Sequence, residues 1–229
     1  MGKIDIDKYN KKAKLFERLV VEEYEDYPEV TLSQEYGHFV HDNLLQFLIR
    51  LARYKFVARL IKKTDTVLEV GCGSGLGTIF LGQHSAKVTG LELKEYELKA
   101  ARKINRRKNV TFLKEDFFDY SPSGKYDVVV AMDVIEHMTA PQAKRLISKM
   151  AGHLKPTGMA IIGTPSIYSY KFQSAVSRAS HVKCYDQKEL TDLVENYFGR
   201  TLAFSMNDEM VHTGFPKMAW YYFVIGLVP

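Results

Sequence analysis

One stretch constrains this chain more than any other: residues 66–78, in which a short apolar strand pattern leads directly into four glycines. Val67 to Val70 has the composition of a buried parallel strand. The glycines stand at alternate positions 71, 73, 75 and 77, and glycine permits positive φ and close approach to the backbone. With a helix expected to begin near Thr78, the stretch predicts a ligand cradle at the carboxyl end of a strand.

The spacing of these glycines argues against a dinucleotide. That fingerprint needs glycine or alanine at its sixth position, which is Leu76 when counted from Gly71 and Thr78 when counted from Gly73. Glu69 also stands two residues before the first glycine, where a carboxylate would repel a pyrophosphate. The carboxylate suits a positively charged ligand, and S-adenosylmethionine carries a sulfonium and an ammonium group. The alternative is a tight turn that binds nothing.

Three motifs resemble one family. The run E-V-G-C-G-S-G, residues 69–75, resembles motif I of the class I S-adenosylmethionine-dependent methyltransferases. D-V-I-E-H, residues 133–137, resembles the small-molecule type such as the ubiquinone-biosynthesis O-methyltransferases, and L-K-P-x-G, residues 154–158, is similar to a turn of that family. The resemblance covers about residues 57–229. It implies S-adenosyl-L-methionine as the cofactor and a Rossmann-like fold whose last strand is antiparallel and inserted beside the sixth.

Composition bounds the remaining possibilities. An apolar content of 46% and a charged content of 26% are ordinary for a globular protein, and no apolar run is long enough for a membrane span. The segment 1–14 is charged and lacks the apolar core of a secretory signal. Cys72 and Cys184 form neither a disulfide framework nor a zinc motif, so we expect a cytoplasmic protein. The net charge of +5 is spread out, and its densest patch, Lys99 to Lys108, is expected to be a solvated helix face.

Beyond residue 65, strand and helix patterns alternate, which predicts an α/β fold: a doubly wound, mostly parallel, seven-stranded sheet with helices on both faces. We expect residues 1–56 to form N-terminal helices that cover the substrate, and residues 57–229 to form the cofactor-binding domain. Insertions near 164–185 and 207–219 are long for such a fold and are expected to act as lids. The expected helices are 9–27, 38–61, 78–82, 95–106, 139–154 and 187–198, and the expected strands are 67–70, 87–92, 110–113, 126–131, 159–163, 202–206 and 220–228.

Acidic residues at strand ends extend the predicted cofactor site. Glu92 ends the second strand about 20 residues after the first glycine, where a carboxylate can accept hydrogen bonds from ribose hydroxyls. The resemblance implies that Asp116 holds the adenine amino group with the Phe117 backbone against the ring, although Glu115 and Asp119 are nearby alternatives. The predicted cofactor-binding residues are Glu69, Gly71, Cys72, Gly73, Gly75, Glu92, Leu93, Asp116, Phe117, Met132 and Asp133.

Methyl transfer to an alcohol requires a base, and histidine suits that task near neutral pH. The candidates are His137, His181 and His212, with His38 or His41 also expected over the site. His137 follows a rigid strand and is expected beside the sulfonium, but each histidine could instead be structural. A metal site is not expected, since nothing in the spacing of Asp133, Glu136, His137, Asp208 and Glu209 demands that they gather.

These observations predict a methyltransferase that acts on a small-molecule acceptor, most simply a sugar or phenol hydroxyl, by in-line displacement. The stretch 206–215 resembles bacterial methyltransferases acting on surface-glycan sugars. The alternatives are a nucleic-acid or protein methyltransferase and a non-catalytic cofactor-binding module. The chain lacks both the D/N-P-P-Y/F motif and the Pro-Cys pair of nucleobase methyltransferases, so a nucleic-acid partner is not expected. The sequence leaves the oligomeric state open.

Overall fold

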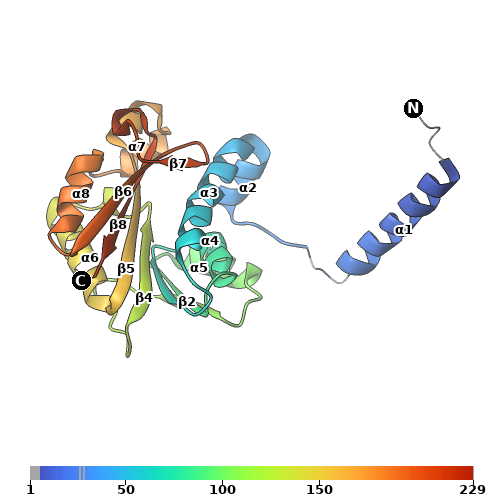
Figure 1. Ribbon diagram of the computed structural model, residues 1–229, viewed down its shortest axis with the longest axis horizontal. Helices are drawn as coiled ribbons and strands as arrows, with labels where there is room; N and C mark the ends of the chain where they lie inside the picture. Colours follow the sequence, from blue (N-terminus) through green and yellow to red (C-terminus); the bar gives the residue numbers. More distant parts are fainter. Residues whose placement is uncertain (1–5, 26, 28, 229) are drawn as a thin grey trace. The chain divides into compact units, whose positions relative to one another are not determined.

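The computed structural model describes residues 6–25, 27 and 29–228, which fall into two compact units that divide between Thr31 and Leu32 (Figure 1). The first unit contains helix α1 (Ile6–Tyr24). This confirms a helix in the predicted range 9–27, although it ends at Tyr24. Residues 1–5 of the charged N-terminal segment, Asp26, Pro28 and the last residue of the chain lie outside the described residues.

The second unit is built on an eight-stranded sheet of order β3-β2-β1-β4-β5-β8-β6-β7. Strands β1 to β5 pair in parallel, whereas β8 runs antiparallel between β5 and β6. The predicted position of the last strand is therefore confirmed. The strands are β1 (Thr66–Val70), β2 (Lys87–Glu92), β3 (Val110–Lys114), β4 (Tyr126–Met132), β5 (Leu154–Pro165), β6 (Arg200–Asn207), β7 (Met210–His212) and β8 (Tyr221–Leu227).

Helices cover both faces of this sheet, as the apolar strands require. Side chains that alternate along each strand pack into two buried cores: Leu68 and Val129 face α6 and α8, while Val67 and Val128 face α3, α4 and α5 (Figure 1). The helical segments are α2 (Gln34–Asp42), α3 (Leu44–Leu60), α4 (Leu76–Gly82), α5 (Glu95–Ile104), η1 (Ile135–His137), α6 (Ala140–His153), η2 (Ile167–Phe172), α7 (Ala175–Ser180), α8 (Gln187–Glu195) and η3 (Pro216–Met218).

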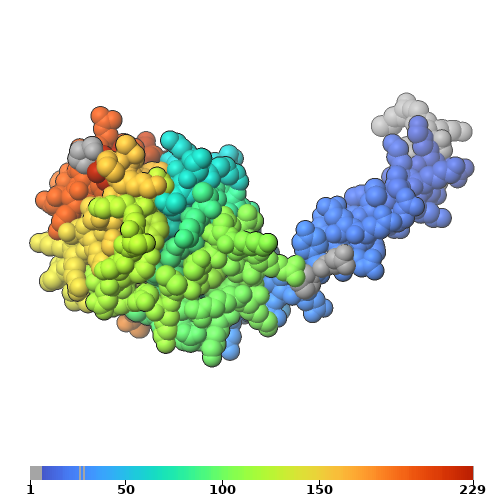
Figure 2. Space-filling model, turned by 90° about the horizontal axis from the view of Figure 1, so that it is seen from below, coloured from blue at the N-terminus to red at the C-terminus, as the bar shows by residue number. Residues whose placement is uncertain are grey.

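The space-filling view shows α6, in yellow, beside the green segment that links β3 to β4 (Figure 2). Lys149 and Arg145 of α6 both donate hydrogen bonds to the carbonyl oxygen of Phe118 in that segment. These contacts hold the loop after β3 against the body of the domain. Among the described residues, no helix combines the length and the apolar character needed to cross a bilayer.

Three details of the predicted fold are wrong. The expected helix 38–61 is two helices, because Asn43 leaves the helical conformation, ends α2 and caps α3 through its side chain. The sheet has eight strands rather than seven, because residues 210–212 of the second insertion pair with β6. The expected turn at residues 155–158 lies within β5, which starts at Leu154 and bulges before Met159.

The insertion after β5 is an ordered cap rather than an irregular loop. It forms η2 and α7, and it returns to the sheet through a parallel bridge between Ser166 and Tyr185. Helix α8 then begins at an N-cap in which the Asp186 side chain accepts from the Glu189 backbone N–H. The segment therefore closes on itself beside the carboxyl ends of the central strands.

Candidate functional site

The backbone of the glycine loop after β1 adopts conformations that are unfavourable for residues with a side chain. Gly71, Gly73 and Gly75 all have positive φ. A Cβ at Gly75 would also meet Ala101 and Phe112, whereas a Cβ at Gly73 would meet no atom within 4 Å. The loop therefore leaves open space above Gly73, and its glycines let a ligand approach the backbone there.

The fourth glycine has a different role. Gly77 lies inside α4, and a Cβ there would fall 2.1 Å from the Tyr54 ring. This close approach places the Tyr54 hydroxyl 2.8 Å from Oε1 of Glu69, to which it donates. Glu69 is fully buried, its Oε2 has no hydrogen-bond partner, and burial raises its pKa from 4.5 to about 7. Its free oxygen marks a place where a ligand cation would be favoured.

The acidic residues predicted after β2 and β3 lie at the same sheet edge, because β3, β2, β1 and β4 are parallel neighbours. Glu92 accepts hydrogen bonds from the backbone N–H groups of Gly73, Leu93 and Lys94 and so connects the glycine loop to the turn after β2. Asp116 accepts from Phe118 N, which fixes the turn after β3. Both carboxylates keep further acceptor capacity for a ligand.

The end of β4 carries the most constrained residue of this edge. Asp133 follows the buried Met132 and has φ of +55°, an uncommon conformation for a non-glycine residue that costs about 1–3 kcal/mol. Its Oδ2 lies 2.6 Å from Nη1 of Arg53 on α3, and the Arg53 guanidinium stacks 4.0 Å above the Tyr221 ring. Among the residues that the structure describes, neither Asp133 Oδ1 nor Arg53 Nε has a hydrogen-bond partner.

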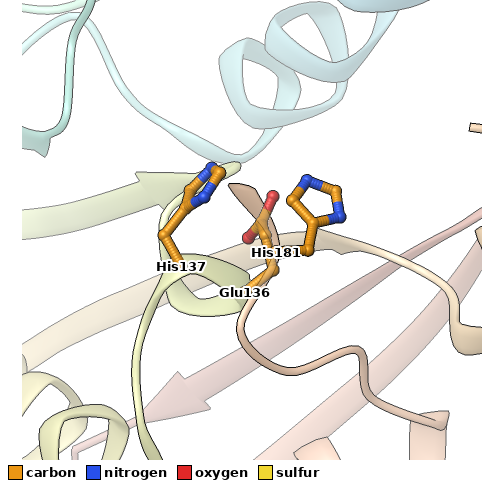
Figure 3. Close-up of side chains that lie close together, drawn as sticks. All are labelled: Glu136, His137 and His181. Atoms are coloured by element: carbon orange, nitrogen blue, oxygen red, sulfur yellow. The ribbon is translucent and has the colours of Figure 1, made fainter. Parts of the chain in front are cut away.

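Beyond β4, three side chains converge in what we term the imidazole–carboxylate cluster: Glu136, His137 and His181 (Figure 3). The two imidazole rings meet edge to face with centroids 5.1 Å apart, and the Glu136 carboxylate lies between them in this view. The Glu136 carbonyl accepts hydrogen bonds from Val182 N and Lys183 N. These backbone bonds fix the end of the cap, and with it His181, against the strand end.

The hydrogen bond of His137 defines which of its nitrogens can act as a base. Its Nδ1 lies 2.9 Å from the carbonyl oxygen of Ser180, and a carbonyl can only accept, so Nδ1 carries the proton. In the neutral ring Nε2 is then the unprotonated nitrogen, and the side chain is exposed. Burial and the neighbouring His137 lower the pKa of His181, whose Nδ1 is buried without a partner.

The same cluster has the composition of a metal site. Its three potential ligand atoms lie within 4.8 Å of one another, and two imidazoles with one carboxylate suit a divalent transition metal. Burial, followed by repulsion from Asp133, raises the pKa of Glu136 to about 8. Cation binding would therefore have to displace a proton from Glu136, which weakens binding at neutral pH.

The other predicted histidines do not join this cluster. His212 lies on β7 with its Nε2 3.3 Å from Asn207 Nδ2, and His38 is exposed and bonded to Asp42. Arg53, Tyr54 and Tyr221 were not expected in the site. Their types and spacing carry no signal for this role, because Arg53 and Tyr54 reach the edge only through the packing of α3 on the sheet, and Tyr221 only through the pairing of β8 with β5.

Comparison with known proteins identifies a methyltransferase domain. The profile described as "Methyltransferase domain" matches residues 67–158, which run from β1 through the bulge of β5. Residues 67–158 therefore form a methyltransferase domain, and the chain is similar to the class I S-adenosylmethionine-dependent methyltransferases. The cofactor of this family is S-adenosylmethionine, as the sequence predicted.

Sequence relatives agree with this family. The chain is 30% identical over 134 residues to a ubiquinone biosynthesis O-methyltransferase of Rickettsia akari (strain Hartford). The aligned region covers 57% of this chain and 52% of the relative. The chain is 31% identical over 121 residues to the protein of that description from Coxiella burnetii (strain RSA 493 / Nine Mile phase I), covering 51% of each. The chain thus spans about half the length of the curated relatives it matches.

Solved structures share the fold. A SAM-dependent methyltransferase of Thermotoga maritima, described as a possible histamine N-methyltransferase, aligns with a TM-score of 0.67 at 17% identity, over 85% of this chain and 95% of that one. The N-methyltransferase NodS of Bradyrhizobium japonicum WM9, solved with S-adenosyl-L-homocysteine, aligns with a TM-score of 0.59 at 16% identity, over 79% and 88%. At these identities the likeness concerns the fold.

Proposed function

We propose that this methyltransferase transfers a methyl group from S-adenosylmethionine to a hydroxyl of a small molecule, a sugar or a phenol, with His137 as the base. The observation that carries the proposal is the His137–Ser180 hydrogen bond, which leaves Nε2 unprotonated on an exposed side chain beside the strand ends. The relatives named O-methyltransferases support hydroxyl chemistry. The cap and α2 supply the cover that a small acceptor needs.

The residues of the sheet edge fit the cofactor. The free Oε2 of Glu69 favours the ammonium group, and the space above Gly73 admits the backbone contact of the methionine portion. Glu92, next to Leu93, is placed for ribose hydroxyls, and Asp116 with Phe117 for adenine. In this proposal Gly71, Cys72 and Gly75 shape the loop, while Met132 and Asp133 border the reacting end.

The cofactor and the protein have separate tasks in this reaction. When bound, S-adenosylmethionine supplies an electrophilic methyl group on a sulfonium, so the acceptor oxygen forms the new C–O bond as the C–S bond breaks and its electrons pass to sulfur. The chain's own task is to orient the hydroxyl in line and to take its proton at His137 Nε2. Ser180 holds the imidazole in the required tautomer. The resulting imidazolium lies beside Glu136 and Asp133, which carry negative charge when ionised.

The test begins with labelled cofactor. Purified protein incubated with methyl-labelled S-adenosylmethionine and a metabolite extract should place the label in a small-molecule fraction as a methyl ether. His137→Ala should lower kcat on that acceptor by about 10²–10⁴ while S-adenosylhomocysteine affinity stays within twofold. His84→Ala is the matched control, since His84 lies at the opposite end of α4 from the glycine loop.

Other outcomes would reassign the function. An amine acceptor brings its own lone pair, so an N-methyl product with near-normal kcat in His137→Ala would remove the hydroxyl chemistry. Label in the RNA, DNA or protein fraction would support the macromolecular alternative. Tight cofactor binding without transfer to any fraction would favour a non-catalytic module. His181→Ala and His212→Ala, assayed beside His137→Ala, identify which histidine is the base.

A further inference from the structure

A hollow lies outside the residues assigned to methyl transfer. It has a volume of about 400 Å³ and lies between η2, η3 and the start of β8; we term it the Trp220 pocket. Its principal lining residues are Tyr168, Lys171, Phe172, Lys217, Met218 and Trp220. A volume of this size accommodates a small organic molecule.

The walls of the pocket expose aromatic surface that folding would ordinarily bury. Trp220 is 50% exposed and Phe172 is 61% exposed, and their ring centroids lie 5.1 Å apart. Tyr168 and Met218 extend the same apolar lining. Exposed rings that gather around a hollow indicate a surface that stacks on a flat ligand, because the ligand would remove this apolar area from water.

The charged side chains that line the Trp220 pocket are both positive. Lys171 and Lys217 lie on opposite walls, and none of the described residues that line the hollow is acidic. Within the described part of the chain neither lysine forms an ion pair, although Lys171 Nζ lies 4.8 Å from the Phe172 ring centroid. Two free ammonium groups beside stacked rings are complementary to a ring compound that carries an anionic group.

Buried hydrogen bonds hold the two walls together. Ser166, at the start of η2, bonds through its Oγ to the Tyr222 hydroxyl, and that hydroxyl donates to the carbonyl oxygen of Pro216 in η3. The Ser166 backbone N–H also donates to Trp220 O. Phe215, which precedes η3, is held at φ of +39°, a strained conformation for a bulky residue. The pocket is therefore a constructed feature of the fold.

We propose that the Trp220 pocket binds a six-membered ring bearing a phosphate or carboxylate group, with the ring stacked on Trp220 and Phe172 and the anion between the two lysines. Binding does not require that the domain transfer a methyl group. That this ligand is the anionic end of the acceptor rests on the proposed function, and it is supported by the position of the pocket at the carboxyl end of β5, the same edge as His137.

The test uses Trp220 itself as the reporter, because it is the only tryptophan of the chain. Titration of the intact protein with phenyl phosphate, benzoate or glucose 1-phosphate should change its fluorescence and saturate. Lys171→Ala/Lys217→Ala should weaken binding of the responding probe by about 10- to 100-fold, the effect of losing charge-assisted contacts. Lys103→Ala/Lys108→Ala removes the same charge from α5 and the turn after it, and should leave the affinity unchanged.

The probes separate the two sources of anion, since phenyl phosphate and glucose 1-phosphate carry phosphate and benzoate carries carboxylate. Phenol, glucose and inorganic phosphate are the single-feature controls and should each bind at least tenfold more weakly. Equal binding of inorganic phosphate would overturn the role of the rings, and equal loss in the two double variants would overturn the role of these lysines. Binding to anionic-lipid vesicles without a response to any soluble ring would reassign the surface to a membrane. S-adenosylhomocysteine affinity, measured in parallel, reports whether the domain remains folded.

Discussion

Replacing Glu69 by glutamine tests the buried carboxylate at the centre of the proposed cofactor site. Glu69 is fully buried, and burial raises its pKa from 4.5 to about 7. The folded protein thus keeps a proton on Glu69 over a pH range in which the unfolded chain has lost it. This stabilisation is fully present below pH 4.5 and is lost as the pH rises through about 7. The interval, at about 1.4 kcal/mol per pH unit, corresponds to about 3 kcal/mol.

Glutamine is neutral at every pH and retains an oxygen that can accept from the Tyr54 hydroxyl. The free energy of unfolding of the wild type should therefore fall by about 2.5 kcal/mol relative to Glu69→Gln between pH 5 and pH 8. Urea unfolding without ligand at several pH values measures this difference, and other titrating groups cancel because both proteins share them. Parallel stability curves across this range would refute the reasoning.

The same carboxylate predicts how cofactor binding depends on pH. A ligand ammonium favours ionised Glu69, so S-adenosylhomocysteine affinity should rise with pH up to about 7 and then level off. Calorimetry in buffers of different ionisation enthalpy should show proton release on binding near pH 6.5 for the wild type and less release for Glu69→Gln. Equal affinity of the two proteins at pH 8 would show that Glu69 does not face the ammonium.

Three further perturbations test the packing and chemistry of this edge. Gly77→Ala should destabilise the domain by about 1–3 kcal/mol because its Cβ would enter the Tyr54 ring, whereas Gly152→Ala, whose Cβ meets open space, should stabilise it slightly; equal urea midpoints would contradict the close packing. Arg53→Ala should cost about 1–3 kcal/mol by leaving the half-buried Asp133 carboxylate unpaired. Arg53→Ala/Asp133→Ala should recover part of that loss, and additive losses would show that the pair is not coupled. EDTA should leave methyl transfer unchanged if His137 is the base, and a loss restored by one divalent ion would assign the imidazole–carboxylate cluster to a metal.

The parts of the fold that the sequence predicts are those set by local pattern. Continuous apolar runs such as Val128 to Ala131 identify the parallel strands, and the glycines identify the turn where a ligand approaches. The exceptions have local causes. Asn43 interrupts a helix whose apolar period continues on both sides, and β7 is only three residues long, too short for a periodic signal.

The candidate site likewise contains residues whose position the sequence predicts and residues whose position it does not. Glu92 and Asp116 could be placed at one sheet edge because parallel strands end together. Arg53 and Asp133 are 80 residues apart, and their pairing depends on how α3 packs against β4. The sequence offered His137, at the end of a rigid strand, as the first candidate base, with His181 and His212 as alternatives. Only the path of the cap, closed by backbone bonds to Glu136, separates the first two from the third.

The difference between the predicted and the unpredicted residues follows from the free-energy cost of forming each interaction. A strand or turn is specified by the preferences of its own residues, whereas a buried polar pair must be held by elements that fold for other reasons. The uncommon backbone of Asp133 and the burial of the Glu136 carboxyl group both disfavour the folded state, so the surrounding packing has to compensate for them. Residues of this kind lie where a ligand can supply the missing partner. The unpaired atoms of Glu69, Asp133 and His181, at successive positions along one edge, are therefore the strongest structural argument that this edge binds both the cofactor and an acceptor.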